Sequence, residues 1–103
     1  MTNPYDYAKA NQERFLAEYQ ELLRIRTIST QPQHADDVAR AAEWLKAMML
    51  RIGMESAEVI LMPEGRCPLV LGEWRGAGED APTILIYCHY DVQPAEVADG
   101  WDT

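Results

Sequence analysis

The sequence is poor in basic side chains and has no long apolar run, and each shortage excludes a class of protein. Nine lysines and arginines stand against 17 aspartates and glutamates, which gives a net charge of −8 over 103 residues. Nucleic acids and anionic membranes attract basic surfaces, so neither is an expected partner. The longest apolar run is too short to cross a bilayer. The polar start of the sequence does not resemble a secretion signal, and we expect a cytoplasmic protein.

Cysteine is also scarce, with Cys67 and Cys88 as the two examples. A disulfide between them stays open, although nothing else in the sequence suggests the oxidising compartment in which disulfides persist. Cys88 lies within an apolar run, so we expect its thiol to behave as a small buried hydrophobic group.

Hydrophobic residues make up 48% of the sequence and follow a helical spacing in two segments. The first segment begins at Pro4, with Asn3 as the N-cap, and ends near Arg24. The second begins near Asp36 and ends before Gly53, a residue typical of the position after a helix. These spacings predict two N-terminal helices.

After the second helix the pattern becomes that of strands, which we expect over residues 55–62, 68–74 and 83–88. The first two can form a hairpin-like pair. The third, "TILIYC", is apolar on both faces and is typical of an interior strand, so we expect Ile84, Leu85 and Ile86 to be buried. The sequence thus predicts an α/β fold in which two helices pack together on one face of a mixed sheet.

An interior strand needs cover on both faces, and the two helices can cover one face only. We therefore expect residues 1–103 to be the incomplete opening part of a larger α/β catalytic domain.

His89 and Asp91 follow the apolar strand directly, where α/β sheets place reactive groups. In an extended stretch both side chains face one side, while Tyr90 faces the other. A neutral imidazole is a good ligand for zinc, and a nearby carboxylate can fix its orientation. The same spacing suits a general base with its orienting group, or two solvated side chains with no function.

Other functional candidates have simpler explanations. Gly72, Gly76 and Gly78 are not followed by the lysine and hydroxyl residue of a phosphate-binding loop, so we expect a turn. We expect His34, Glu96 and Asp99 to be solvated. The spacing of Cys67 from His89 matches no known zinc motif.

The string "HYDVQPAEVADGW", preceded by "TILIYC", resembles the first metal-site motif of the zinc-dependent dipeptidase and aminoacylase family. This family includes carnosinases and succinyl-diaminopimelate desuccinylases, and the motif is most similar to that of the carnosinase-like dipeptidases. Residues 35–60 resemble the family's second helix and first strand, and residues 68–74 resemble the next strand. The resemblance covers nearly the whole sequence.

The resemblance implies that His89 is a ligand of one zinc ion in a two-metal site, and that Asp91 holds the His89 imidazole. Manganese or cobalt could replace zinc. The metals of such a site activate water and polarise the amide carbonyl. The other ligands and the general base would lie beyond Thr103.

The prediction is therefore a metal-dependent hydrolase of dipeptides or N-acyl amino acids, which we expect to be a homodimer at full length. We expect residues 1–103 alone to be inactive and to self-associate. The alternative is a small non-catalytic α/β binding or interaction module.

Overall fold

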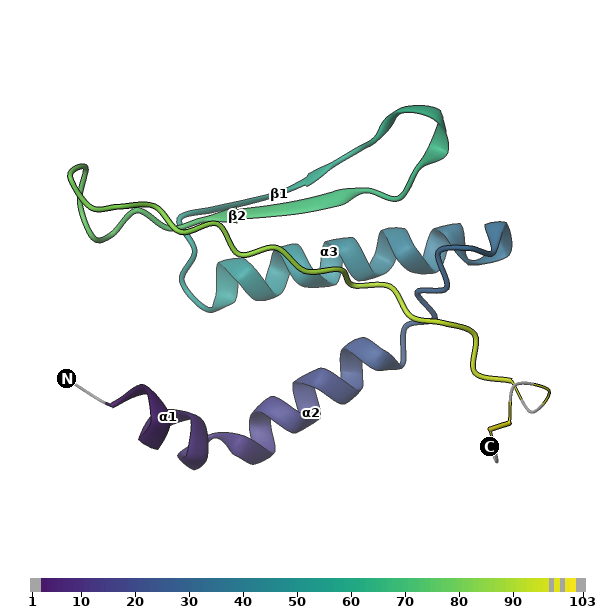
Figure 1. Cartoon of the computed structure of the whole chain (residues 1–103), viewed down its shortest axis with the longest axis horizontal. Coiled ribbons are helices and arrows are strands. Elements are labelled where there is room, and N and C mark those ends of the chain that lie inside the picture. The colour runs from purple at the N-terminus through teal and green to yellow at the C-terminus, as the bar shows by residue number, and fades with distance from the viewer. Residues whose placement is uncertain (1–2, 97, 99, 102–103) are drawn as a thin grey trace.

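The computed structural model describes residues 3–96, 98 and 100–101. The helices are α1 (Pro4–Ala10), α2 (Gln12–Leu23) and α3 (Ala35–Arg51), and the strands are β1 (Ser56–Ile60) and β2 (Leu69–Glu73). Two short 3₁₀ turns, η1 (Pro32–His34) and η2 (Pro63–Gly65), precede α3 and join the strands. Figure 1 shows the order of these elements along the chain.

The first predicted helix is interrupted at Asn11, which separates α1 from α2. Asn3 caps α1 as predicted, since its side-chain oxygen accepts a hydrogen bond from the Tyr5 backbone N–H at 2.8 Å. The Asn11 side-chain amide donates to the Tyr7 carbonyl at 2.9 Å, and the backbone there leaves the helical region. Asparagine side chains compete in this way with the helical hydrogen-bond ladder, so the helix bends at this residue.

The second predicted helix is present as α3, within two residues of the expected bounds. Gly53 ends it with φ of 105°, a conformation that glycine adopts without steric cost. The Gly53 N–H donates to the Leu50 carbonyl at 3.2 Å, and the Met54 N–H donates to the Met49 carbonyl at 3.0 Å. This pair of bonds is the Schellman ending of a helix.

The two early strands form the predicted hairpin. β1 pairs antiparallel with β2, and Val59 lies opposite Val70 at the centre of the register. α3 packs against both strands. The contact is close at Gly72, where an added Cβ would lie 2.7 Å from the Met49 Sδ atom. Gly72 therefore has a packing role, in agreement with the rejection of a phosphate-binding loop.

The prediction for residues 83–88 is wrong in this structure. The segment runs as an irregular chain outside the two-stranded sheet, and Ile84, Leu85 and Ile86 are each more than four-fifths exposed. Cys88 is exposed as well, in contrast to the buried thiol that we expected. The physical reason is that an interior strand needs paired edges and covered faces. The described residues supply neither to this segment.

The expected arrangement of helices on a mixed sheet also needs correction. The observed sheet is a two-stranded antiparallel hairpin, and α3 lies between it and the pair α1–α2 in Figure 1. α2 reaches α3 through polar contacts, including a 2.8 Å hydrogen bond from the Trp44 indole N–H to Glu21. The structure is thus a small α/β unit in which one helix, rather than two, covers the sheet.

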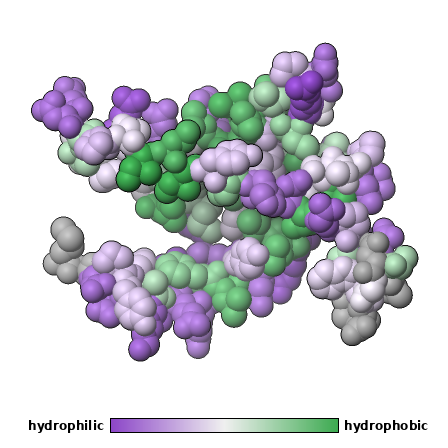
Figure 2. Space-filling view, viewed as in Figure 1, coloured by the Kyte–Doolittle hydropathy of each residue, from purple (hydrophilic) through white to green (hydrophobic). Residues whose placement is uncertain are grey.

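The core is small for a chain with this many apolar residues. Among the described residues the buried ones are Ile25, Thr27, Val38, Ala41 and Ala42. The radius of gyration is 16.5 Å, whereas a compact chain of this length has about 13 Å. Figure 2 shows hydrophobic side chains exposed around the sheet and a hollow between the pair α1–α2 and the remainder of the molecule. Much of the apolar surface is therefore unburied.

Of the helices that the structure describes, none combines the length and apolar character needed to span a bilayer.

Candidate functional site

Residues 90–92 form hydrogen bonds with two distant parts of the chain, although the side chains of the apolar segment before them are exposed. The Val92 backbone N–H donates to the Thr27 carbonyl at 3.0 Å. The Tyr90 hydroxyl donates to the Pro68 carbonyl at 2.6 Å. Because Thr27 is 2% exposed, the first bond fixes the segment to a well-packed part of the molecule. These two bonds position the loop that carries His89 and Asp91.

His89 and Asp91 face the same side, and Tyr90 points toward Pro68 instead. The His89 Nδ1 atom lies 2.8 Å from the Asp91 Oδ1 atom. An ionised carboxylate only accepts hydrogen bonds, so the neutral imidazole carries its proton on Nδ1. The Nε2 atom then has a free lone pair, and the His89 side chain is 79% exposed. This arrangement leaves one nitrogen available for a metal ion or a proton.

Ser29 completes the cluster. Its hydroxyl donates to the Asp91 Oδ2 atom at 2.5 Å, across 62 positions of sequence. Each carboxylate oxygen of Asp91 therefore has its own donor. The hydrogen bond from Ser29 is the main reason that the pKa of Asp91 lies below its usual value. Burial opposes this shift, and the hydrogen bond from His89 lowers the pKa further. Asp91 is accordingly a stable acceptor for the His89 proton near neutral pH.

The pKa of Tyr90 is shifted in the opposite direction to that of Asp91. Burial raises the pKa of its hydroxyl, and the nearby Cys67 and Asp91 reinforce the rise. The Tyr90 hydroxyl thus remains protonated as a hydrogen-bond donor to Pro68 over the physiological range. Its role in the site is to hold the loop.

A complete metal-binding group is not found within residues 3–96, 98 and 100–101, where no cluster of three histidine, cysteine or carboxylate side chains could hold an ion. Cys67 and Cys88 are free thiols, so the disulfide left open by the sequence is not formed. Glu96 is exposed, and Asp99 lies outside the described residues. His89 is the available nitrogen ligand with an orienting carboxylate.

His34, expected to be solvated, is instead a half-buried structural residue. Its Nδ1 atom lies 2.8 Å from the Asp37 Oδ2 atom at the start of α3, and Asp37 also pairs with Arg40 at 2.9 Å. The hydrogen bond to His34 is the leading reason that the pKa of Asp37 is lowered. This second histidine–aspartate pair lies at the N-terminus of α3.

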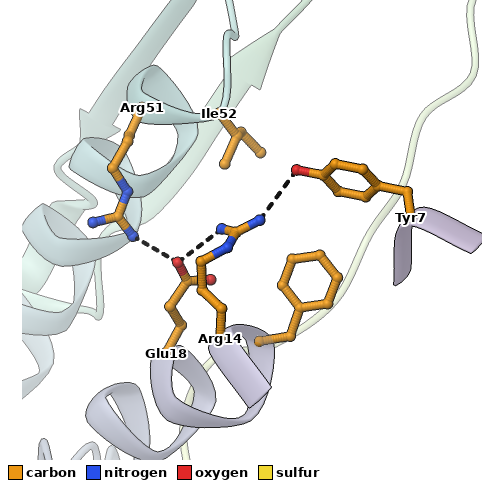
Figure 3. A pocket seen from close by; sticks show the side chains of 6 residues that line it. Tyr7, Arg14, Glu18, Arg51 and Ile52 are labelled. Carbon is orange, nitrogen blue, oxygen red and sulfur yellow. Dashed lines mark hydrogen bonds and ion pairs between the residues drawn. The ribbon is translucent and has the colours of Figure 1, made fainter. Parts of the chain in front are cut away.

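A separate hollow of about 700 Å³ lies between the pair α1–α2 and the end of α3. Figure 3 shows the side chains that line it. Glu18 contacts both guanidinium groups there, at 3.1 Å from Arg14 and 3.3 Å from Arg51. Arg14 also donates to the Tyr7 hydroxyl at 3.1 Å and lies 4.8 Å from the centre of the Phe15 ring. These contacts satisfy both cations, so the hollow is a structural junction between α2 and α3.

No spacing pattern in the sequence indicates a role for Ser29 or Thr27 in the site. The stretch "TISTQ" is rich in hydroxyl groups and interrupts two helical patterns, and that was the available signal. Spacing alone could not show that it lies beside His89, because the contact joins segments about 60 residues apart.

The relatives of this chain are dipeptidases. It is 34% identical over 91 residues to a cysteinylglycine-S-conjugate dipeptidase of Corynebacterium striatum, a match that covers 88% of this chain and 19% of the relative. It is 32% identical over 114 residues to a Beta-Ala-His dipeptidase of Mus musculus, covering 96% of this chain and 22% of the relative. A Cys-Gly metallodipeptidase of Saccharomyces cerevisiae is 23% identical over 112 residues, covering 100% of this chain and 23% of the relative.

No protein-family model matches the chain, and no solved structure matches it at a significant level. The chain spans about a fifth of the length of the relatives it matches. The similarity extends along nearly all of the chain and includes relatives whose names describe two dipeptide specificities. Along nearly all of its length, the chain is thus similar to part of the dipeptidases, among them the Cys-Gly metallodipeptidases and the Beta-Ala-His dipeptidases.

Proposed function

We propose that this chain is the N-terminal part of a metal-dependent dipeptidase, in which His89 binds a metal ion. The observation that carries the proposal is the His89–Asp91 pair. The 2.8 Å bond fixes the imidazole through Nδ1 and leaves Nε2 exposed at the surface. Metal-binding histidines are commonly held in this way by a carboxylate on the other ring nitrogen. The dipeptidase names of the relatives support the same reaction.

The residues present fit one corner of a metal site. Zinc, with manganese or cobalt as alternatives, accepts imidazole nitrogen as a ligand. In the two-metal site that we propose, zinc would polarise the amide carbonyl and activate water. This chain contributes His89 as a ligand and Asp91 as the group that holds it. The remaining ligands and the general base lie outside residues 1–103.

The proposed substrates are dipeptides or N-acyl amino acids, and the proposed full-length protein is a homodimeric cytoplasmic enzyme. The exposed apolar segment supports the view that the structure is part of a larger fold. Residues 83–88 have the composition of an interior strand, yet their side chains are exposed here. Additional strands and a covering layer would bury this segment, as interior strands of α/β sheets require.

The test is a hydrolysis assay on the full-length protein, with β-Ala-His and Cys-Gly as substrates. We expect turnover that a chelator abolishes and that added zinc, manganese or cobalt restores. Elemental analysis of the untreated protein should find two metal ions per chain. Turnover that persists in the chelated, metal-free protein, or no turnover of either dipeptide with any of the metals, would contradict the proposal.

The 103-residue chain alone should behave differently. A single imidazole binds zinc weakly compared with the three or four ligands of protein sites, so we expect neither tight zinc binding nor hydrolysis. The exposed apolar segment should cause self-association. Zinc titration and light scattering test both statements, and Leu85→Lys should reduce the scattering. A stable monomer with submicromolar zinc affinity and measurable turnover would show that the chain is self-sufficient.

A further inference from the structure

Ser29 lies in the loop between α2 and α3 and contacts the carboxylate of Asp91. Its hydroxyl lies 2.5 Å from the Asp91 Oδ2 atom, while the Asp91 Oδ1 atom lies 2.8 Å from His89 Nδ1. We propose that Ser29 is a positioning residue, whose hydrogen bond fixes the Asp91 carboxylate and thereby selects the His89 tautomer that has Nε2 free. This inference rests on the proposed function for its link to metal binding, but its structural part can be tested without metal.

The Asp91 carboxylate needs a hydrogen bond to hold its orientation. An aspartate carboxylate rotates easily about its last side-chain bond, and that torsion has broad, shallow preferences. A donor on Oδ2 removes this freedom and leaves Oδ1 directed at the imidazole. Hydrogen bonds to an ionised acceptor are stronger than those between neutral groups, so the constraint is effective even at a half-exposed site. Ser29 thus orients the lone pair that receives the His89 proton.

Ser29 is itself held in place by the packing of its own loop. Two residues earlier, the Thr27 carbonyl accepts the Val92 backbone N–H at 3.0 Å, and Thr27 is almost fully buried. The loop containing Ser29 and the stretch containing Asp91 are therefore joined by a backbone bond as well as by the side-chain bond. This backbone bond keeps the hydroxyl and the carboxylate at hydrogen-bonding distance.

Because His89 is exposed, its orientation depends on the hydrogen bonds from Ser29 to Asp91 and from His89 to Asp91. Its side chain is 79% exposed, and its described hydrogen bond is the one to Asp91. Packing therefore contributes little to the orientation of the ring. An unconstrained neutral histidine prefers the proton on Nε2, which would block the exposed nitrogen from binding a metal. The hydrogen bonds from Ser29 to Asp91 and from His89 to Asp91 reverse that preference and place the proton on Nδ1.

The experiment compares Ser29→Ala with Ser29→Thr, which keeps the hydroxyl, and with Thr30→Ala, which removes an exposed hydroxyl from the next position. The first readout is the imidazole tautomer in metal-free, ¹⁵N-histidine-labelled protein, measured by NMR. His34 is an internal reference, because it makes the same 2.8 Å bond to an aspartate without a serine.

In the wild-type protein and in Ser29→Thr and Thr30→Ala, we expect the His89 proton on Nδ1. In Ser29→Ala the proton should shift toward Nε2, while the His34 signals stay unchanged. The second readout is zinc affinity of the full-length protein, which should fall about tenfold in Ser29→Ala, at the low end for partners beyond the ligands. Circular dichroism should show that the helices remain in every variant.

An unchanged His89 tautomer in a folded Ser29→Ala protein would overturn the inference, as would an equal shift at His34. A tautomer shift that Ser29→Thr does not prevent would also overturn it, because the hydroxyl would then not be the cause. Failure of the proposed function is recognised separately. A full-length protein without metal-dependent hydrolysis would remove the metal role and leave the tautomer result to decide the positioning role.

Discussion

His34 with Asp37 and His89 with Asp91 form the same hydrogen bond, in which an imidazole Nδ1 atom lies 2.8 Å from a carboxylate oxygen. Their surroundings differ. The side chains of the first pair are 16% and 24% exposed, and those of the second are 79% and 40% exposed. The first pair is thus packed against the molecule, whereas the second presents its imidazole to solvent.

The partners of the two carboxylates also differ. The Asp37 carboxylate accepts a second hydrogen bond from the Arg40 guanidinium of the same helix, so its hydrogen bonds stabilise the first turn of α3. The Asp91 carboxylate accepts a second hydrogen bond from the Ser29 hydroxyl of a distant loop, so its hydrogen bonds orient the His89 side chain. An acidic side chain in the first helical turn also interacts favourably with the helix dipole. The two histidine–aspartate pairs therefore share one hydrogen bond and differ in the neighbours that hold their carboxylates.

The largest effect should come from replacing each histidine in the full-length protein. His89→Ala removes the proposed metal ligand, so metal content and dipeptide hydrolysis should collapse, by more than the roughly 10–100-fold typical of groups behind the ligands. His34→Ala should leave both unchanged and weaken the start of α3. Elemental analysis and a hydrolysis assay measure the difference. Two metal ions per chain and wild-type turnover in His89→Ala would exclude His89 as a ligand.

Replacing the carboxylates should have a smaller effect in the same direction. Asp91→Asn keeps the shape of the side chain but loses the charge, so we expect a folded protein whose zinc affinity or hydrolysis falls about 10–100-fold. Asp37→Asn is the matched control, and its activity should equal that of the wild type. Equal rates in Asp91→Asn and in the wild type would mean that the Asp91 carboxylate does not support His89.

The smallest effect concerns the pH dependence of the first pair. The hydrogen bond from His34 lowers the pKa of Asp37 in the folded chain, so its stabilising contribution is present above the ordinary aspartate value of about 3.9. That contribution disappears as the pH falls through the lowered pKa, because the folded carboxylate is then protonated. After correction for the intrinsic pH dependence of exchange, the amides at the start of α3 should therefore lose protection from hydrogen exchange in acid.

Asp37→Asn is the control for this experiment, since it has no carboxyl group to titrate. Its exchange at the start of α3 should already be fast near neutral pH and should change less on acidification, after correction for the intrinsic pH dependence of exchange. If the wild type and this variant lose protection in parallel, another group is responsible for the acid sensitivity.

Several local features could be predicted because they depend on neighbouring residues. Asn3 caps α1, Gly53 ends α3 in a left-handed conformation, and the strands on either side of η2 form a hairpin. The interruption at Asn11 was missed, since the apolar spacing continues through it. The alternation of His89, Tyr90 and Asp91 gave the correct relative directions of their side chains.

The burial of residues 83–88 could not be judged from their composition. Their apolar side chains predict an interior strand, yet burial depends on the strands and helices that surround a segment, and these residues are exposed here. The assignment of roles to the two histidines failed in part for the same reason. His34 was expected to be solvated, but it is half-buried against Asp37.

The sequence by itself determined the local units: the helix ends, the hairpin, and the placement of His89 and Asp91 on one side of an extended chain. Each depends on backbone preferences and side-chain spacing over a few residues. Only the tertiary structure decided that Ser29 donates a hydrogen bond to Asp91 and that Val92 donates one to Thr27. It also decided that residues 84–86 are exposed. Those contacts join residues about 60 positions apart, and their formation depends on how the elements pack, which local preferences do not specify.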